Sequence, residues 1–202
     1  ATAFAPVRTR PRRTYDEMTD EFRPEGDHVP IVLAKLLAGR NGERKHPSVD
    51  ALNEFGRASG LFKKVDVKRL GKQPSGPLQV RVKSDGLDAN LVDVGYGVSQ
   101  ALPIVTDAIR AATGEVLLIQ QPEVHLHPRA QAALGTMFCE LSADSKKQFV
   151  IETHSDYLVD RVRLAIADKL ITKEHVQILY LARSGTETKV HPISLDDAGN
   201  VV

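Results

Sequence analysis

Several features are scarce or missing in this sequence. It has a single cysteine, Cys139, among 202 residues, so an intrachain disulfide framework is excluded and a reducing compartment, the cytoplasm, is expected. No apolar run reaches the roughly 18–20 residues that span a bilayer, so no membrane segment is expected. Neither sign of charge dominates, because 27 Lys and Arg face 26 Asp and Glu. The composition therefore predicts no overall attraction to nucleic acid.

Internal repeats and low-complexity segments are also absent, and the length suits one domain with a sizeable core. The chain starts without an initiator methionine or a signal-peptide pattern, so we expect that upstream residues have been removed or left out. The stretch before Asp16 is rich in arginine, with Arg8 and Arg10 among them, and has no acid. Such a stretch is typical of a solvated face, with a contact to phosphate or nucleic acid as the alternative.

The second half of the chain alternates between strand and helix patterns. Helical spacing of apolar residues predicts helices over 29–37, 49–59, 100–112 (capped by Ser99), 129–142 and 156–169. Period-two alternation predicts a half-buried strand over 78–82, and continuous apolar runs predict strands buried on both faces over 116–119 and 149–151. Two more strands are expected over 176–182 and 188–193. The order predicts an α/β fold whose parallel sheet includes the strand over 176–182.

Three polar clusters lie where such a sheet binds ligands, at strand ends or at a helix start. The first, 94–100, is a glycine loop entering a helix, which suits an anion as well as it suits a plain turn with an N-cap. The second, 120–128, directly follows a strand, and the third, 152–156, follows the next one. A single histidine at a strand end is usually structural, but two such clusters on successive parallel strands favour a functional site.

The motifs at these strand ends resemble a known family. Gln-Pro-Glu-x-His-Leu-His-Pro after the strand over 116–119, followed by Ile-Glu-Thr-His-Ser over 151–155, is similar to the C-terminal half of an ABC-type ATPase head. The nearest group is the OLD-like AAA-family ATPases, related to RecF and SMC heads and often found in phage defence. The resemblance covers about 4–202 and implies a P-loop NTPase fold of ABC-head type. It also implies a small helical insertion or lid over about 29–70 and a lobe over 78–202 that carries the signature loop, the Walker B strand, the D-loop and the switch histidine.

The resemblance assigns roles to individual residues. In the signature loop, Gly95, Gly97, Ser99 and Gln100 would contact the γ-phosphate of ATP held by the opposite subunit, and His125 and His127 belong to the D-loop that crosses the dimer interface. Gln120 stands where an acid reaches Mg²⁺ through water, and Gln121 stands at the catalytic-base position. Glu123 would orient water or support the site, His154 would sense the γ-phosphate, and Arg8 is a further candidate contact to phosphate.

Two departures from the family pattern limit this interpretation. Gln120 is a neutral amide and lacks the charge that Mg²⁺ favours, which predicts slow hydrolysis from an engineered trap or from a naturally weakened enzyme. No Gly-x-x-x-x-Gly-Lys-Ser/Thr motif is present either, so the phosphate-binding loop is missing. We therefore expect the C-terminal part of a longer ATPase domain, which binds ATP poorly by itself and needs its N-terminal half.

The resemblance implies a homodimer or higher oligomer closed by an ATP sandwich, which controls an effector such as a nuclease in antiviral defence or DNA maintenance. Two alternatives stay open. A metal-dependent hydrolase could use a set of metal-ligand side chains: Glu123, His125, His127, His154 and Asp156. A non-catalytic interaction lobe could instead supply the signature loop and D-loop in trans, with 29–70 as its docking surface.

Overall fold

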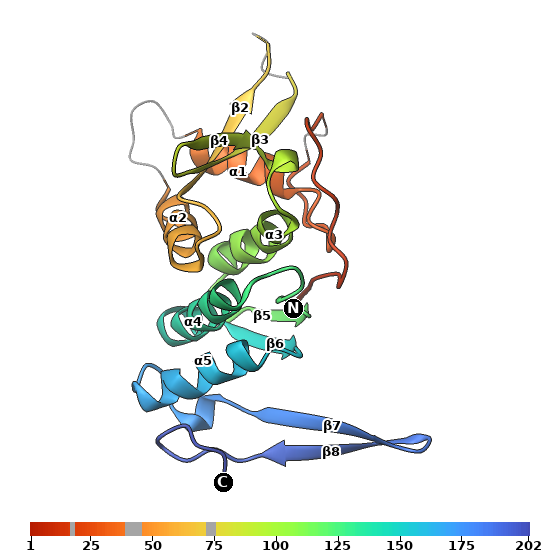
Figure 1. The fold of residues 1–202 in the computed structure, drawn as a ribbon, viewed down its shortest axis with the longest axis vertical. Coiled ribbons are helices and arrows are strands. Elements are labelled where there is room, and N and C mark those ends of the chain that lie inside the picture. Colours follow the sequence, from red (N-terminus) through yellow and green to blue (C-terminus); the bar gives the residue numbers. More distant parts are fainter. Residues whose placement is uncertain (17–18, 39–45, 72–75) are drawn as a thin grey trace.

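The computed structural model describes residues 1–16, 19–38, 46–71 and 76–202, arranged along one long axis (Figure 1). An antiparallel sheet lies at one end, a parallel sheet lies in the middle, and a hairpin lies at the other end. The elements in chain order are β1 (Thr2–Ala3), α1 (Val29–Leu37), α2 (Pro47–Ser59), β2 (Lys64–Arg69), β3 (Leu78–Ser84), β4 (Leu87–Asn90), η1 (Leu91–Asp93), α3 (Tyr96–Arg110), β5 (Val116–Gln120), α4 (Pro128–Ser145), β6 (Gln148–Glu152), α5 (Asp156–Ala167), η2 (Lys173–His175), β7 (Ile178–Ser184) and β8 (Glu187–Ile193).

The parallel sheet has the order β1-β5-β6 and carries the polar clusters at its carboxyl edge. β5 and β6 pair in parallel along their whole length, up to Gln120 opposite Glu152. The two residues of β1 pair with the other side of β5, which brings the N-terminus beside it (Figure 1). Leu117 and Ile119 are buried in the main core together with residues of α3 and α4. The predicted parallel pairing of these two strands is thus confirmed.

The second face of this sheet is open in the described part of the chain. Leu118 is 38% exposed and Val150 is 60% exposed. The prediction that both strands are buried on both faces is therefore wrong for this chain, because the core that covers Leu117 and Ile119 lies on one face only. A continuous apolar run therefore does not by itself establish burial on both faces, since the described residues bury only one face of these strands.

β7 does not join the parallel sheet, and the prediction of a third parallel strand is wrong. It pairs in antiparallel register with β8, from Ile178 opposite Ile193 to Ser184 opposite Glu187. Only two residues connect the strands, and the first, Gly185, has a φ of 65°. So short a connection permits only an antiparallel pair of β7 with β8, and the described residues pair β7 with no strand of the parallel sheet.

The segment expected to form a helical insertion over about 29–70 is only partly helical. Helix α1 covers the predicted residues and α2 begins two residues before the predicted start, but Lys64–Arg69 forms β2, which pairs with β3 in antiparallel register. Residues 39–45 of this segment lie outside the described residues. None of the described helices combines the length and hydropathy that crossing a bilayer requires.

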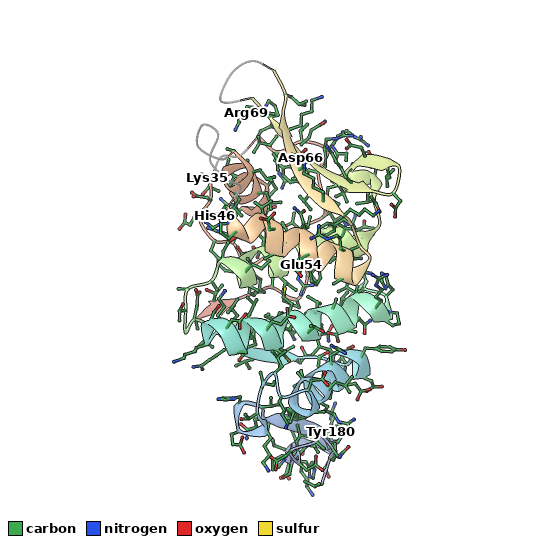
Figure 2. The ribbon with its side chains drawn as sticks, turned by 90° about the vertical axis from the view of Figure 1, so that its left-hand side faces the viewer. Lys35, His46, Glu54, Asp66, Arg69 and Tyr180 are labelled. Carbon is green, nitrogen blue, oxygen red and sulfur yellow. The ribbon has the colours of Figure 1, made fainter. Side chains whose placement is uncertain are left out.

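A buried amide bonds α2 to the edge of the antiparallel sheet. β2 is an edge strand, and its Val65 amide donates to the side-chain oxygen of Asn53 on α2 at 3.1 Å. Both residues are buried. Figure 2 looks onto this side of the molecule, with Glu54 of α2 below Asp66 of β2. The Asn53 side chain thus satisfies a strand N–H that no other strand among the described residues reaches.

Replacing Asn53 with alanine is expected to lower the free energy of unfolding by about 1–3 kcal/mol, because the buried Val65 amide loses its acceptor. Urea unfolding followed by circular dichroism measures this change. Glu54→Ala is the matched control, since Glu54 is exposed on the same helix. Equal stabilities of the two variants would contradict the role given to Asn53.

Candidate functional site

Gln121, one residue beyond the ladder, bonds the end of β5 to the end of β6. The Gln121 amide donates to the carbonyl oxygen of Glu152 at 2.8 Å, and its side-chain nitrogen donates to a Glu152 carboxylate oxygen at 3.2 Å. Gln121 has a φ of 45°, in the left-handed region, so the chain turns away sharply at this point. Gln120, the last residue of β5, is exposed at the strand end. The two glutamines at the predicted Walker B position therefore have different environments.

The turn between β5 and α4 is the predicted D-loop. The Leu126 amide donates to the carbonyl oxygen of Glu123 at 2.9 Å, and His125 between them has a φ of 65°. Leu126 is buried, which anchors the turn to the core, while His125 and His127 are exposed. His127 is the N-cap residue of α4, and Pro128 follows at the first helical position, where its missing N–H costs nothing. The turn thus presents two imidazoles to solvent.

Glu123 connects this turn to the loop after β6. One of its carboxylate oxygens accepts a hydrogen bond from the backbone amide of His154 at 2.7 Å. The imidazole of His154 is exposed, and its Nε2 lies 3.5 Å from a carboxylate oxygen of Glu152. The backbone of His154 is thereby fixed while its side chain remains accessible.

A second connection between the two loops runs through Gln131, which the sequence analysis did not single out. Its side-chain nitrogen donates to the carbonyl oxygen of Leu126 at 2.8 Å, and its side-chain oxygen accepts from the Ser155 hydroxyl at 2.6 Å. Ser155 also caps α5 by accepting from the Leu158 amide at 3.1 Å. Gln131 lies on the first turn of α4, a position where a polar residue carries no recognisable signal in a single sequence.

The predicted signature loop packs against the D-loop of the same chain. A Cβ atom on Gly97 would lie 2.9 Å from the carbonyl oxygen of His125, so only glycine allows this close approach. The rings of Tyr96 and His125 lie 5.7 Å apart, tilted by 38°. Gly95 is the N-cap residue of α3 and is exposed. The start of α3 thus lies directly against the predicted D-loop.

Ser99 and Gln100 lie elsewhere than the sequence predicts. Helix α3 begins at Tyr96, so the prediction that Ser99 caps the helix is wrong. The Ser99 hydroxyl donates to the carbonyl oxygen of Tyr96 at 2.9 Å inside the first turn, and both Ser99 and Gln100 are buried. Gly95 is the N-cap residue instead. Its backbone is extended, and the helix begins directly after it, four residues before the predicted start.

Arg8 is buried, with 2% of its surface exposed, so the prediction of a solvated arginine face is wrong for this residue. Its guanidinium donates to the carbonyl oxygen of Gln120 at 3.1 Å. Burial lowers the pKa of Arg8 to about 10, and the Glu123 carboxylate opposes that shift. Arg8 therefore remains charged at neutral pH beside the end of β5. Arg10 and Arg12 are exposed, as a solvated face requires.

The described residues give no support to metal or cysteine chemistry within this chain. They contain no group of three or more His, Cys, Asp or Glu side chains arranged to hold a metal ion. The set proposed for a metal-dependent hydrolase, including Asp156, therefore does not assemble into a site. Burial raises the pKa of the Cys139 thiol to about 11, which keeps it protonated and unreactive.

Solved structures with the same architecture define the class of the fold. The chain resembles a solved structure described under "Structural biochemistry of ATP-driven dimerization and DNA stimulated activation of SMC ATPases", with a TM-score of 0.52 and 16% identity over 73% of this chain and 83% of that one. It also resembles the Smc head domain of Pyrococcus furiosus bound to the C-terminal domain of ScpA, with a TM-score of 0.52 and 15% identity over 73% of this chain and 34% of that one. The fold is thus that of a P-loop NTPase of the ABC-type ATPase-head class.

Sequence comparison identifies the family. Residues 6–160 match the family model described as "AAA domain, putative AbiEii toxin, Type IV TA system", and the chain belongs to this family of ABC-type AAA ATPases. The chain is also 26% identical to an OLD nuclease of Thermus scotoductus (strain ATCC 700910 / SA-01) over 104 residues, 50% of this chain and 20% of that protein. It therefore spans about a fifth of the length of this curated relative. The family resemblance drawn from the motifs is confirmed.

Replacing Gly97 with alanine is expected to destabilise the fold by about 1–3 kcal/mol, because the new methyl group collides with the backbone of the D-loop. Urea unfolding measures the change. Gly95→Ala is the matched control, since its Cβ would meet nothing within 4 Å, and its cost should stay below about 1 kcal/mol. If both variants lose the same stability, the contact between the two loops does not constrain residue 97.

Proposed function

We propose that this chain forms the signature, Walker B and switch region of an ATPase head, in which ATP binding and hydrolysis drive dimerisation of heads. One observation carries the proposal: three loops meet at the carboxyl edge of the parallel sheet. Gly97 packs on His125, and Glu123 bonds to the His154 amide across neighbouring strands. Ligands of open parallel sheets bind at this edge. Ser99 is buried in this chain, so we assign the signature contact to the exposed backbone at Gly95 and to the surface beside it.

The chemistry of phosphoryl transfer suits these groups. It needs an oriented water and neutralisation of the charge on the transferred group, with little covalent participation by the protein. The exposed imidazole of His154 is suited to hydrogen-bond a γ-phosphate, and the amide of Gln121 is suited to orient a water. Glu123 already accepts a hydrogen bond from the backbone amide of His154, so we assign Glu123 to positioning the switch loop.

The open face of the parallel sheet supports a second lobe. Leu118 and Val150 expose apolar surface on the side that the described residues leave uncovered, and the sequence has no phosphate-binding loop motif. We propose that a lobe carrying a Walker A motif, supplied by the same polypeptide or by a separate one, covers this face and completes the ATP site. A homodimer or higher oligomer closed by ATP then follows from the exposed signature loop and D-loop.

Magnesium is the ion such reactions use, but the donor set of this chain does not fit it. Gln120 offers a neutral amide where Mg²⁺ favours a carboxylate, and no group of three metal-ligating side chains forms among the described residues. We therefore derive no step through the ion, and a link from Gln120 to Mg²⁺ through a water stays a prediction.

The biological setting is a proposal from relatives. The similarity to an OLD nuclease supports control of a nuclease effector in antiviral defence or DNA maintenance, in the cytoplasm. Exposed Arg10 and Arg12 are candidates for contact with nucleic acid. A non-catalytic lobe that supplies its loops in trans to another ATPase would share this geometry. Measuring ATP turnover distinguishes that alternative from an ATPase head.

Replacing Gln120 with glutamate is expected to raise ATP turnover at least about tenfold, the effect of about 1.4 kcal/mol of transition-state stabilisation, because a carboxylate returns to the strand end. Phosphate release is measured in the assembly that contains a Walker A segment. Gln148→Glu is the matched control: it adds the same charge at the opposite end of β6, on an exposed residue.

An unchanged rate in Gln120→Glu would sink the assignment of Gln120 to the Walker B position. Light scattering of the same assembly with and without ATP tests head dimerisation. If neither turnover nor an ATP-dependent increase in mass is found, the ATPase proposal fails as a whole.

A further inference from the structure

Two loops leave the carboxyl edge of the parallel sheet on neighbouring strands: the predicted D-loop (121–127) after β5 and the switch loop (153–155) after β6. One bridge between them is the hydrogen bond from the His154 amide to the Glu123 carboxylate, at 2.7 Å. A single hydrogen bond fixes one distance between two loops and leaves their relative orientation to other contacts. The position of the switch loop therefore depends on a second bridge.

Gln131 supplies the second bridge from the first turn of α4. Its side-chain nitrogen donates to the Leu126 carbonyl oxygen at 2.8 Å, and its side-chain oxygen accepts from the Ser155 hydroxyl at 2.6 Å. Leu126 and Ser155 are both buried, so water competes little for these bonds. One side chain thus holds the end of the D-loop and the end of the switch loop at the same time.

The hydrogen bonds around Gln131 run in one direction. The Ser155 hydroxyl accepts from the Leu158 amide at 3.1 Å, and its single hydrogen goes to the Gln131 oxygen. The chain of donors thus runs from α5 through Ser155 and Gln131 to the D-loop. Hydrogen bonds linked in this way polarise and strengthen one another. Removing the amide of Gln131 therefore interrupts the chain at both of its ends.

The two bridges belong to one closed circuit of bonds. Within the D-loop, the Leu126 amide donates to the Glu123 carbonyl oxygen at 2.9 Å, which joins the residues where the two bridges are anchored. Within the switch loop, His154 and Ser155 are neighbours in sequence. A shift of either loop alone must therefore break at least one of these hydrogen bonds, whereas a shift of both together need break none.

We propose that Gln131 is a positioning residue of the nucleotide site: it joins the D-loop and the switch loop into one unit, so that contacts made at the D-loop set the position of His154. The proposal rests on the ATPase function proposed above and adds a residue that does not touch ATP. His125 and His127 are exposed side chains of the D-loop on which a second head would act, and the His154 imidazole is exposed on the switch loop. Gln131 thus makes hydrolysis respond to the dimerisation of heads.

The kinetic test uses the assembly that hydrolyses ATP. Gln131→Met keeps the length of the side chain and removes both bonds. It is expected to lower kcat about fivefold or more, with KM changed by less than about twofold, because positioning acts on the reaction and not on ATP binding. Dimerisation with ATP, followed by light scattering, should be retained.

Thr136→Val is the matched control for this test. Thr136 lies more than one turn further along α4 and accepts a hydrogen bond from Arg161 of α5 at 3.0 Å. The control therefore removes a bond between the same two helices, away from both loops, and should keep the wild-type kcat.

Gln131→Glu separates the two bonds of Gln131. Its carboxylate still accepts from the Ser155 hydroxyl, but it places a second oxygen where the Leu126 carbonyl needs a donor. A role confined to supporting the cap of α5 would let this variant keep the wild-type kcat, whereas joining two loops requires both bonds. We therefore expect Gln131→Glu to lose at least as much kcat as Gln131→Met. A wild-type kcat in either variant, or a change in KM alone, would overturn the proposal.

A second test needs no ATP and separates this proposal from the ATPase assignment. Hydrogen exchange at the His154 amide is measured in the same assembly without nucleotide, with amides of β5 as the reference for global folding. Gln131→Met should raise exchange at His154 about tenfold relative to β5, since the remaining bond to Glu123 then opens more easily. Thr136→Val should leave this ratio unchanged.

Equal increases at His154 and in β5 would show that Gln131 only stabilises the fold, and unchanged exchange at His154 would show that the loops are not joined through it. Either result would refute the proposal. If the exchange results are as expected but no assembly hydrolyses ATP, the joint between the two loops stands and the ATPase assignment falls.

Discussion

The parallel pairing of β5 with β6 is the constraint on which the candidate site depends. It ends at Gln120 opposite Glu152, and the Gln121 amide extends it by one further bond to the Glu152 carbonyl. The loops that follow β5 and β6 must therefore begin side by side at the carboxyl edge of the sheet. Only then can Glu123 reach the His154 amide at 2.7 Å, a contact between residues on different loops. A slip of register by one residue would turn every side chain of a strand to the other face and separate these groups.

The two faces of the same sheet differ. One face is packed against α3 and α4, and the other exposes Leu118 and Val150. The loops at its edge are fixed by hydrogen bonds, yet the sequence contains no Gly-x-x-x-x-Gly-Lys-Ser/Thr motif. The arrangement favours an ATPase head over a metal-dependent hydrolase, since its histidines lie on exposed loops and form no metal-binding group within the described residues. The family match agrees with that preference.

Local patterns predicted the elements well where one interaction dominates. The apolar spacing in Val29–Leu37 marked α1 to the residue, because helix periodicity and burial agree there. The pattern failed where distant contacts decide. Ser99 has the chemistry of an N-cap but lies inside α3, and the strand over 178–184 follows its hairpin turn and not the parallel sheet. Of the site, the motifs located Glu123 and His154, but the bond between them and the part played by Gln131 needed the fold.

The sequence by itself determined the family, the α/β class and the loops that carry the polar residues, because those depend on motif chemistry and on periodicity along the chain. Only the tertiary structure decided that Arg8 is buried at the end of β5, that one face of the sheet is open, and that Gly97 lies against the backbone of His125. The physical reason is that burial and pairing of charged groups depend on residues far apart in sequence. Arg8 and Gln120 meet only because β1 lies beside β5, and no local pattern around either residue records that neighbour.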